Sequence, residues 1–159
     1  MKAVIDTAIQ DVSRIAHNIS PHILEQFGFV KALETFTNTI AASRAVEFRT
    51  EFGNIGRFDL KRELTLYRTL TELIHSTIKH AGASQVTIRC TTSDGVLTVD
   101  YSDNGCGFSN GKTEGLGNGI GLTSLQNRIQ SLGGTITIQS TSTNGISAHI
   151  EIPLAEEAL

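Results

Sequence analysis

Residues 103–122 read DNGCGFSNGKTEGLGNGIGL, with glycine at positions 105, 107, 111, 115, 117, 119 and 121. Glycine has no Cβ, so a flat ligand or a phosphate can approach its backbone closely. The segment leads into a helical pattern that starts at Leu122, and the unpaired N–H groups of a helix start favour a bound phosphate. Each cluster alone is a weak signal, because DxGxG can be a plain turn and GxGxG occurs in many flexible loops. Their succession predicts a nucleotide-phosphate site.

Asp103 follows an alternating β pattern over residues 96–101. A buried carboxylate only accepts hydrogen bonds, so it could bind the exocyclic amine of adenine and would disfavour a base with a carbonyl at that place. We therefore interpret Asp103 as a base-reading residue beside the glycine loop.

A long helix pattern precedes these strands, over about residues 60–80. At about 100° per residue, one side of this helix is polar and carries Glu72, Ser76, Lys79 and His80. The opposite side is apolar and carries Leu66, Tyr67, Leu70, Ile74 and Ile78. A carboxylate, a hydroxyl and two cationic groups in a common space suit a metal-bound polyphosphate. An ordinary solvated face is the alternative, since any amphipathic helix has a polar side.

The remaining patterns predict the fold class. Helical patterns cover 5–19, 30–45 and 122–132, and strand patterns cover 46–49, 85–91, 96–101, 135–140 and 146–152. Runs of strands beside runs of helices favour an α+β fold, a two-layer α/β sandwich whose mixed, mostly antiparallel sheet packs on helices. We place a boundary near residue 28, between a helical segment and linker (1–27) and the main domain (28–156).

Composition excludes several classes of function. The chain has 159 residues, 39% of them hydrophobic, with 13 Lys and Arg against 16 Asp and Glu, a formal charge of −3. It therefore has no basic field to attract nucleic acid or an acidic membrane surface. Cys90 and Cys106 lack the spacing of a zinc site or disulfide framework, which favours a reducing cytoplasm. No apolar run approaches the ~20 residues of a membrane span, so we expect a cytoplasmic piece without direct membrane contact, with any membrane anchor of a sensor elsewhere.

Taken together, residues 28 to 153 resemble the ATP-binding catalytic domain shared by histidine kinases, gyrase-type ATPases and heat-shock chaperones. The segments ELIHSTIKHA (72–81), DNGCGF (103–108) and GNGIGL (117–122) are similar to the N, G1 and G2 boxes of that family, in the same order. LYR (66–68), LQNRI (125–129) and LGG (132–134) resemble the histidine kinase branch. The resemblance implies the Bergerat ATP-binding fold and a two-component phosphotransferase with ATP and magnesium (Mg²⁺) as cofactors.

The same resemblance assigns roles to individual residues. Asp103 would read adenine, Glu72 would orient the nucleophile, and Lys79 and His80 would flank the phosphates as catalytic groups. Further cofactor-binding positions implied by the boxes are Gly105, Gly107, Gly117, Gly119, Gly121 and Leu122. Ser76 stands where the N box normally carries the Asn that holds Mg²⁺, and its hydroxyl is the expected metal ligand.

Two departures from the family pattern leave alternatives open. Ser76 is shorter than Asn, and Ile146 follows Gly145 where the family has Thr, whose hydroxyl supports the adenine-reading acid through water. A nucleotide-binding regulatory module with weakened catalysis is therefore one alternative. A related serine kinase of the anti-sigma type is another.

His17 is a candidate phosphoacceptor, since histidine kinases transfer phosphate to an imidazole nitrogen. Only ten residues separate it from Gly28, too few for a turn and a returning helix. We interpret residues 1–27 as the C-terminal part of a dimerisation helix and its linker, with His17 on the helix surface. The acceptor is then expected outside this chain, on the dimerisation helices of a homodimer, and a response regulator is the expected partner.

Overall fold

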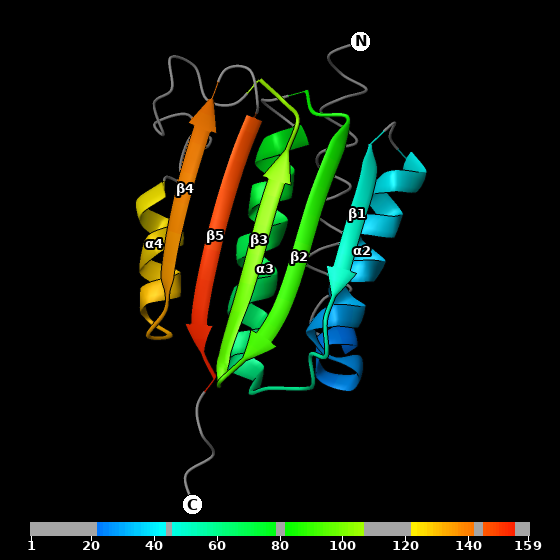
Figure 1. Ribbon diagram of the computed structural model, residues 1–159. Helices are drawn as coiled ribbons and strands as arrows, with labels where there is room; N and C mark the ends of the chain where they lie inside the picture. The colour runs from blue at the N-terminus through cyan, green and yellow to red at the C-terminus, as the bar shows by residue number, and fades with distance from the viewer. Residues whose placement is uncertain (1–21, 44–45, 79–81, 107–121, 142–144, 155–159) are drawn as a thin grey trace, which may run out of the picture.

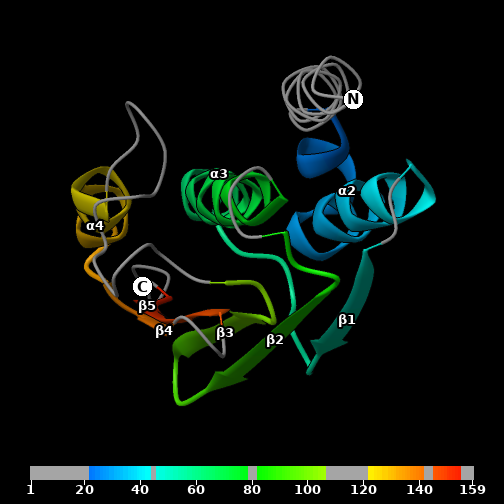
Figure 2. The same cartoon turned by 90° about the horizontal axis from the view of Figure 1, so that it is seen from above.

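The computed structural model describes residues 22–43, 46–78, 82–106, 122–141 and 145–154. Within these residues a short helical segment, 22–27, is followed by three helices and five strands. In chain order they are α2 (Phe29–Ser43), β1 (Glu47–Phe52), α3 (Leu60–Ser76), β2 (Gln85–Ser93), β3 (Val96–Asp103), α4 (Leu122–Gln130), β4 (Thr135–Thr141) and β5 (Gly145–Pro153). The helices lie side by side on one face of the sheet, as Figures 1 and 2 show. The predicted α+β sandwich is confirmed.

The sheet has the order β1-β2-β3-β5-β4. β1 and β2 are parallel, with Glu47 opposite Gln85, and the other neighbouring pairs are antiparallel. The parallel pair needs a crossover connection, which α3 provides. The β2–β3 hairpin turns at Asp94 and Gly95, whose φ angles of 53° and 76° suit a tight two-residue hairpin loop. The mostly antiparallel sheet predicted from the alternating patterns is therefore correct.

α3 is the central helix of the helical layer (Figure 2). Asp59 caps its start, because the Asp59 carboxylate accepts a hydrogen bond of 3.0 Å from the Arg62 N–H. The side that was predicted to be apolar faces the sheet. Leu66, Tyr67, Leu70 and Ile74 are buried, and Ile78 is partly buried against the same core. Their partners on the sheet are alternate strand residues, which include Val86, Ile88, Val99, Tyr101 and Ile150. Burial of these two faces forms the core and orients the polar side of α3 away from it.

The element boundaries differ slightly from the sequence patterns. α3 ends at Ser76 rather than at residue 80, and residues 79–81 lie outside the described part. α4 ends at Gln130, and Gly133, with φ of 76°, closes the turn before β4. Leu24 of the segment 22–27 is fully buried in the core. The domain boundary near residue 28 stays a prediction, but the segment before it packs firmly on the main fold.

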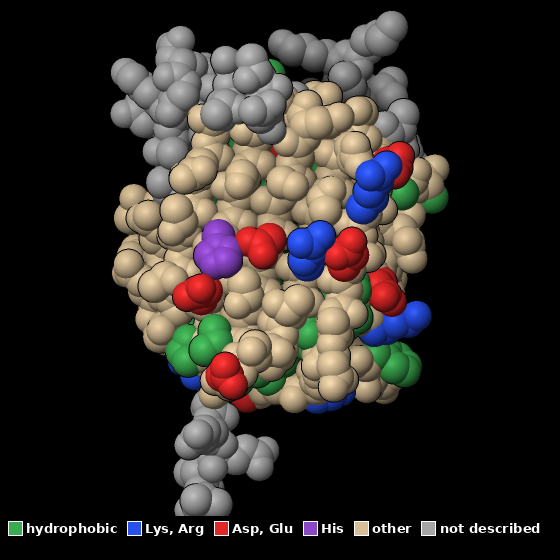
Figure 3. Space-filling view, viewed as in Figure 1, with side chains coloured by type: hydrophobic (Ala, Val, Ile, Leu, Met, Phe, Trp, Pro, Cys, Tyr) green, Lys and Arg blue, Asp and Glu red, His purple; other side chains and the backbone are tan. Residues whose placement is uncertain are grey.

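The second face of the sheet has no helix over it in the described residues, and Figure 3 shows a row of charged side chains across it. The strand register places Glu51, Arg89, Asp100 and His149 in one line across β1, β2, β3 and β5. Arg89 Nε lies 2.8 Å from Glu51 Oε2, and His149 Nδ1 lies 2.5 Å from Asp100 Oδ1. The other ring nitrogen of His149 lies 3.2 Å from Glu151. Opposite charges in register across neighbouring strands stabilise their pairing.

His149 gives stability a pH dependence. Its hydrogen bonds to Asp100 and then Glu151 raise the pKa of His149 above the usual 6.5. Its charged contacts are therefore fully present below about pH 6.5 and are lost as the pH rises through the raised pKa. We expect His149→Gln to remove this part of the pH dependence, measured by urea unfolding between about pH 6 and pH 9, with a change below about 1 kcal/mol because the side chain is half exposed. Identical pH curves for parent and variant would contradict this assignment.

None of the described helices is both long enough and apolar enough to cross a membrane.

Candidate functional site

Asp103 lies at the end of β3, at the same end of the molecule as the C-terminus of α3 (Figure 1). Its side chain is buried, with the residue 6% exposed. Oδ1 accepts hydrogen bonds from the N–H groups of Gly105 at 2.9 Å and Ile146 at 3.2 Å. Oδ2 accepts one from the Thr77 hydroxyl at 2.8 Å. Three fixed donors hold this carboxylate in one orientation, and its remaining lone pairs can accept from a ligand.

Thr77 and Tyr101 form a hydroxyl chain behind this carboxylate. The Tyr101 phenol lies 2.5 Å from Thr77 Oγ1 and 3.4 Å from both Asp103 Oδ2 and the Leu73 carbonyl. Burial, and then the charge of Asp103, raise the pKa of Tyr101 well above its usual 10. Tyr101 therefore stays protonated and donates to Thr77, which donates to Asp103.

The sequence pattern did not single out Thr77. It lies four residues beyond Leu73, on the side of α3 that faces the core, so its hydroxyl is buried at a position where the spacing leads one to expect an apolar residue. A polar threonine at a position expected to be apolar was the signal from which its role could have been predicted. The Thr77 hydroxyl bonds Asp103 directly, so Asp103 has a hydroxyl partner even though Ile146 cannot supply one. Ile146 contributes its backbone N–H instead.

We expect Thr77→Val to weaken the binding of any ligand that Asp103 holds, and to lower the stability of the fold. Valine has the shape of threonine but leaves Asp103 and Tyr101 without their shared partner, a loss of about 1–3 kcal/mol in the free energy of unfolding. Thr77→Ser, which keeps the hydroxyl, is the matched control. Urea unfolding of both variants tests this role, and equal stability of the Val and Ser variants would show that the methyl group rather than the hydroxyl matters.

Gly145 lies against the same carboxylate. Its φ of 76° is in the left-handed region, and a Cβ at this position would collide with both the carbonyl oxygen and Oδ1 of Asp103. The fold therefore brings backbone from the start of β5 into direct contact with the end of β3. Only glycine fits there.

Glu72 and Ser76 lie one turn apart near the end of α3, both half-buried. Glu72 Oε1 accepts a hydrogen bond of 2.5 Å from Arg128 Nη1 on α4. Glu72 Oε2 is buried and has no hydrogen-bond partner among the described residues. This ion pair, which the sequence reasoning missed, connects the polar side of α3 to α4. It restrains the position of the Glu72 carboxylate.

The buried cysteine, Cys90, offers no further chemistry here. Burial, and then the charge of Asp100, raise the pKa of the Cys90 thiol to about 12, so it is not a nucleophile near neutral pH. Among the described residues no three His, Cys, Asp or Glu side chains gather as a metal site.

The sequence model of the histidine kinase-, DNA gyrase B- and HSP90-like ATPases matches residues 61–156. The chain belongs to this ATPase family. The sensor histidine kinase ComP of Bacillus subtilis (strain 168) is 29% identical over 158 residues, which are 97% of this chain and 20% of ComP. The signal transduction histidine-protein kinase/phosphatase DegS of Brevibacillus brevis is 27% identical over 160 residues, 99% of this chain and 40% of DegS. The chain thus spans less than half the length of these relatives.

Solved structures of this ATPase family share the fold. The histidine kinase domain of the blue-light activated histidine kinase EL346 from Erythrobacter litoralis superposes with a TM-score of 0.65 at 20% identity, covering 77% of this chain and 59% of that one. The ATP binding domain of PrrB from Mycobacterium tuberculosis superposes with a TM-score of 0.58 at 18% identity, covering 76% of this chain and 88% of that one. The fold is that of histidine kinase ATP-binding domains, and the match to sensor kinases identifies an ATP-binding catalytic domain of the histidine kinase type.

The family's boxes can now be located in the structure. The end of α3, with Glu72 and Ser76, meets the end of β3, with Asp103 and Gly105, through the hydrogen bond from Thr77. Leu122 begins α4. The other predicted site residues lie outside the described part of the chain: Lys79, His80, Gly107, Gly117, Gly119 and Gly121. The structure therefore joins the N box to the G1 box, and the contribution of the G2 glycines stays a prediction.

The described residues fit adenine. The buried Asp103 carboxylate, which three donors hold rigidly, is an acceptor that matches an exocyclic amine. Gly145, which lies against it, has no side chain that would obstruct this carboxylate. They also fit a weakly held Mg²⁺, because Mg²⁺ keeps several waters and usually takes its other oxygen ligands from one or two carboxylates and from substrate phosphates. Ser76 offers only a neutral hydroxyl oxygen, at the end of α3.

Proposed function

We propose that this chain binds ATP with Mg²⁺ and transfers the γ-phosphoryl group to a histidine outside the chain. The acceptor would lie on the dimerisation helices of the same sensor protein, which would be a homodimer with this domain in the cytoplasm. The phosphoryl group would then pass to a response regulator. The observation that carries this proposal is the buried Asp103 carboxylate, which Thr77, Gly105 and Ile146 hold in place as an acceptor. Such a group selects a base by its amine.

Each residue would have a defined task in the transfer. Asp103 binds the adenine amine, and Gly105 and Gly107 leave room for the base. Gly117, Gly119, Gly121 and Leu122 form the phosphate cradle at the start of α4. Ser76 would hold Mg²⁺, which neutralises phosphate charge when bound. Lys79 and His80 add positive charge beside the phosphates.

Glu72 would orient the attacking imidazole. One oxygen of its carboxylate is held by Arg128, and the other is buried without a partner among the described residues, so it could accept the N–H of an incoming imidazole once binding makes it accessible. An accepted N–H on one ring nitrogen leaves the lone pair of the other nitrogen for attack on phosphorus. Arg128 is therefore a positioning residue for Glu72 in this mechanism.

A second candidate is a nucleotide-binding module with weakened catalysis. The observation that favours it is Ser76, whose hydroxyl reaches less far than the family's asparagine. The other departure, Ile146, argues less strongly for it, because Thr77 supplies Asp103 with a hydroxyl. Ser76→Asn tests this cause, since it would restore transfer only if weak Mg²⁺ binding were the limit.

Radiolabelled phosphate transfer tests the proposal. We would incubate the chain with γ-labelled ATP, Mg²⁺ and a dimerisation segment carrying a histidine. We expect label on that segment that is lost in acid and kept in alkali, as for phosphohistidine. ATP binding without transfer in the parent protein would favour the regulatory module, recovery of transfer in Ser76→Asn would assign its weakness to Ser76, and acid-stable label would identify a serine kinase.

A further inference from the structure

The segment 22–27 meets the catalytic fold at a single glycine. The Gly28 N–H donates to the Leu24 carbonyl at 3.1 Å, and the Gly28 carbonyl accepts from the Ala32 N–H at 3.1 Å. Gly28 has φ of 91°, so it ends one helical segment and directly precedes α2. The end of a helix leaves carbonyl groups without partners, and the start of the next leaves N–H groups without partners. Both kinds of group lie together at this junction.

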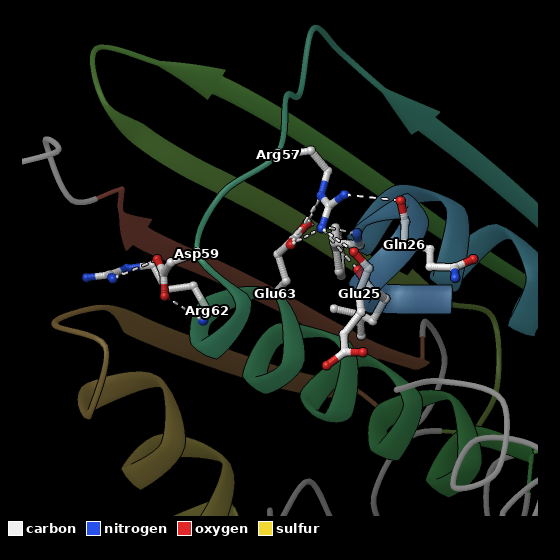
Figure 4. Close-up of polar contacts among 8 residues, drawn as sticks. Glu25, Gln26, Arg57, Asp59, Arg62 and Glu63 are labelled. Atoms are coloured by element: carbon white, nitrogen blue, oxygen red, sulfur yellow. Dashed lines mark hydrogen bonds and ion pairs between the residues drawn. The ribbon is translucent and has the colours of Figure 1, made fainter. Parts of the chain in front are cut away.

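Arg57 binds the carbonyl groups, as Figure 4 shows. Its Nη2 lies 3.2 Å from the Leu24 and Glu25 carbonyl oxygens, and its Nη1 lies 3.4 Å from that of Gln26. These three carbonyls form the last turn of segment 22–27, where the helix dipole favours a cation. The guanidinium fork can reach all three at once, which a lysine ammonium cannot do in the same geometry.

Glu63 binds the other end of the junction. It lies in the first turn of α3, its side chain is 1% exposed, and Oε2 accepts the Phe29 N–H at 2.9 Å. Phe29 is the first residue of α2, where the helix dipole favours an anion. Arg57 Nε and Nη2 lie 3.2 Å from the Glu63 oxygens. We call this pair the Arg57–Glu63 clamp, and it holds segment 22–27, α2 and α3 together.

The clamp leaves no space at Gly28. A Cβ there would lie 2.5 Å from Arg57 Cδ, 2.7 Å from Arg57 Nε and 3.1 Å from Glu63 Oε2. The rings of Phe29 and Phe58 pack beside it with centroids 6.0 Å apart. The junction is thus a close fit of three elements, rather than a loose linker.

A gain in stability alone does not explain the clamp. Removing a carboxylate from water costs free energy, and apolar side chains of the same volume often stabilise a fold equally well or better. A hydrogen-bonded ion pair does impose one geometry, because each donor and acceptor has a fixed direction. The better explanation is that the clamp sets the angle between segment 22–27 and the helices α2 and α3.

We propose that the Arg57–Glu63 clamp fixes the angle at which the helix on the N-terminal side enters the catalytic domain, and so positions the nucleotide site for phosphoryl transfer. This inference rests on the proposed function, in which the acceptor histidine is attached on that side. α3 carries Glu63 in its first turn and Ser76 at its end, about 20 Å apart along one helix. A change in angle at the clamp therefore moves the whole site relative to the acceptor. Arg57 and Glu63 are positioning residues, without contact to the nucleotide.

The first test measures the junction itself. In the full-length sensor protein, Arg57→Met removes the fork while keeping the length of the side chain. We expect amide hydrogen exchange over residues 22–29 to become about tenfold faster, with exchange in β3 and β5 unchanged. Arg89→Met is the matched control, because Arg89 is also half exposed and ion-paired, with Glu51 on the open face of the sheet. Unchanged exchange over 22–29 in the Arg57 variant would overturn the inference.

The second test measures phosphoryl transfer in the same proteins. We expect Arg57→Met to lower kcat for phosphohistidine formation by about tenfold with an unchanged KM for ATP, because misplaced reactants react slowly while nucleotide contacts persist. Arg57→Lys keeps the charge without the fork and should not restore the rate, and Arg89→Met should behave as the parent. An unchanged kcat, or a KM that rises in parallel, would overturn the positioning role. A parent protein that forms no phosphohistidine would overturn the proposed function instead, and the exchange experiment would still report on the clamp.

Discussion

Gly145→Ala is expected to lower the free energy of unfolding by about 2–4 kcal/mol and to abolish measurable ATP binding. Two costs add at this position. An alanine at φ of 76° is strained, and its Cβ would collide with the carbonyl and carboxylate of Asp103. The structure can relieve the collision only by moving β5 away from β3 or by turning Asp103 out of its site. The second movement breaks the hydrogen bonds from Gly105 and Ile146.

Gly95 provides the matched control. It has the same φ of 76°, but nothing lies within 4 Å of the Cβ that Gly95→Ala would add. That variant should show the conformational strain alone, about 1–2 kcal/mol, with ATP affinity unchanged. Urea unfolding and calorimetry with ATP and Mg²⁺ on both variants separate strain from collision. Equal losses of stability in the two variants would mean that contact between Gly145 and Asp103 does not constrain the site.

The periodic parts of the fold could be predicted from sequence. The apolar side of α3, from Leu66 to Ile74, is buried because the positions of a helix that share a side follow from its 3.6-residue turn. The strands β2 and β3 alternate between buried and exposed residues, and the SDG sequence at 93–95 indicated the hairpin between them. These features depend on near neighbours in the chain. Asp103 at a strand end could be predicted for the same reason.

The connections between elements could not be predicted in this way. Thr77 bonds Asp103 across 26 positions of sequence, Arg57 bonds the Leu24 carbonyl across 33, and Arg128 bonds Glu72 across 56. No local period brings such pairs together, because their proximity results from the packing of helices on the sheet. The departure at Ile146 illustrates the consequence. The sequence pattern showed that position 146 lacks the hydroxyl that would support Asp103, whereas the packing brings the Thr77 hydroxyl from the end of α3 to Asp103.

Asp103→Asn is expected to weaken ATP binding about 10- to 150-fold, which corresponds to the loss of a hydrogen bond to a charged group, about 1.5–3 kcal/mol. The amide oxygen of asparagine should take the place of Oδ1, because the N–H groups of Gly105 and Ile146 demand an acceptor. The amide NH₂ then replaces Oδ2 beside Thr77, whose hydroxyl can accept as well as donate. The fold is therefore retained, while the site presents a donor to the adenine amine. A donor repels an amine but suits a carbonyl, so the preference for ATP over GTP should also fall.

Asp100→Asn is the matched control for that experiment. Asp100 lies on the same strand but on the open face, where it bonds His149, so its substitution should leave ATP affinity unchanged. Calorimetry with ATP and with GTP in the presence of Mg²⁺, on the parent and both variants, gives the affinities and their ratio. If Asp103→Asn bound ATP as tightly as the parent, the base would be read elsewhere. The three donors around Asp103 would then stabilise the junction of β3, β5 and α3 without selecting a ligand. A loss of ATP affinity with an unchanged ATP to GTP ratio would mean that Asp103 shapes the pocket rather than reading the amine.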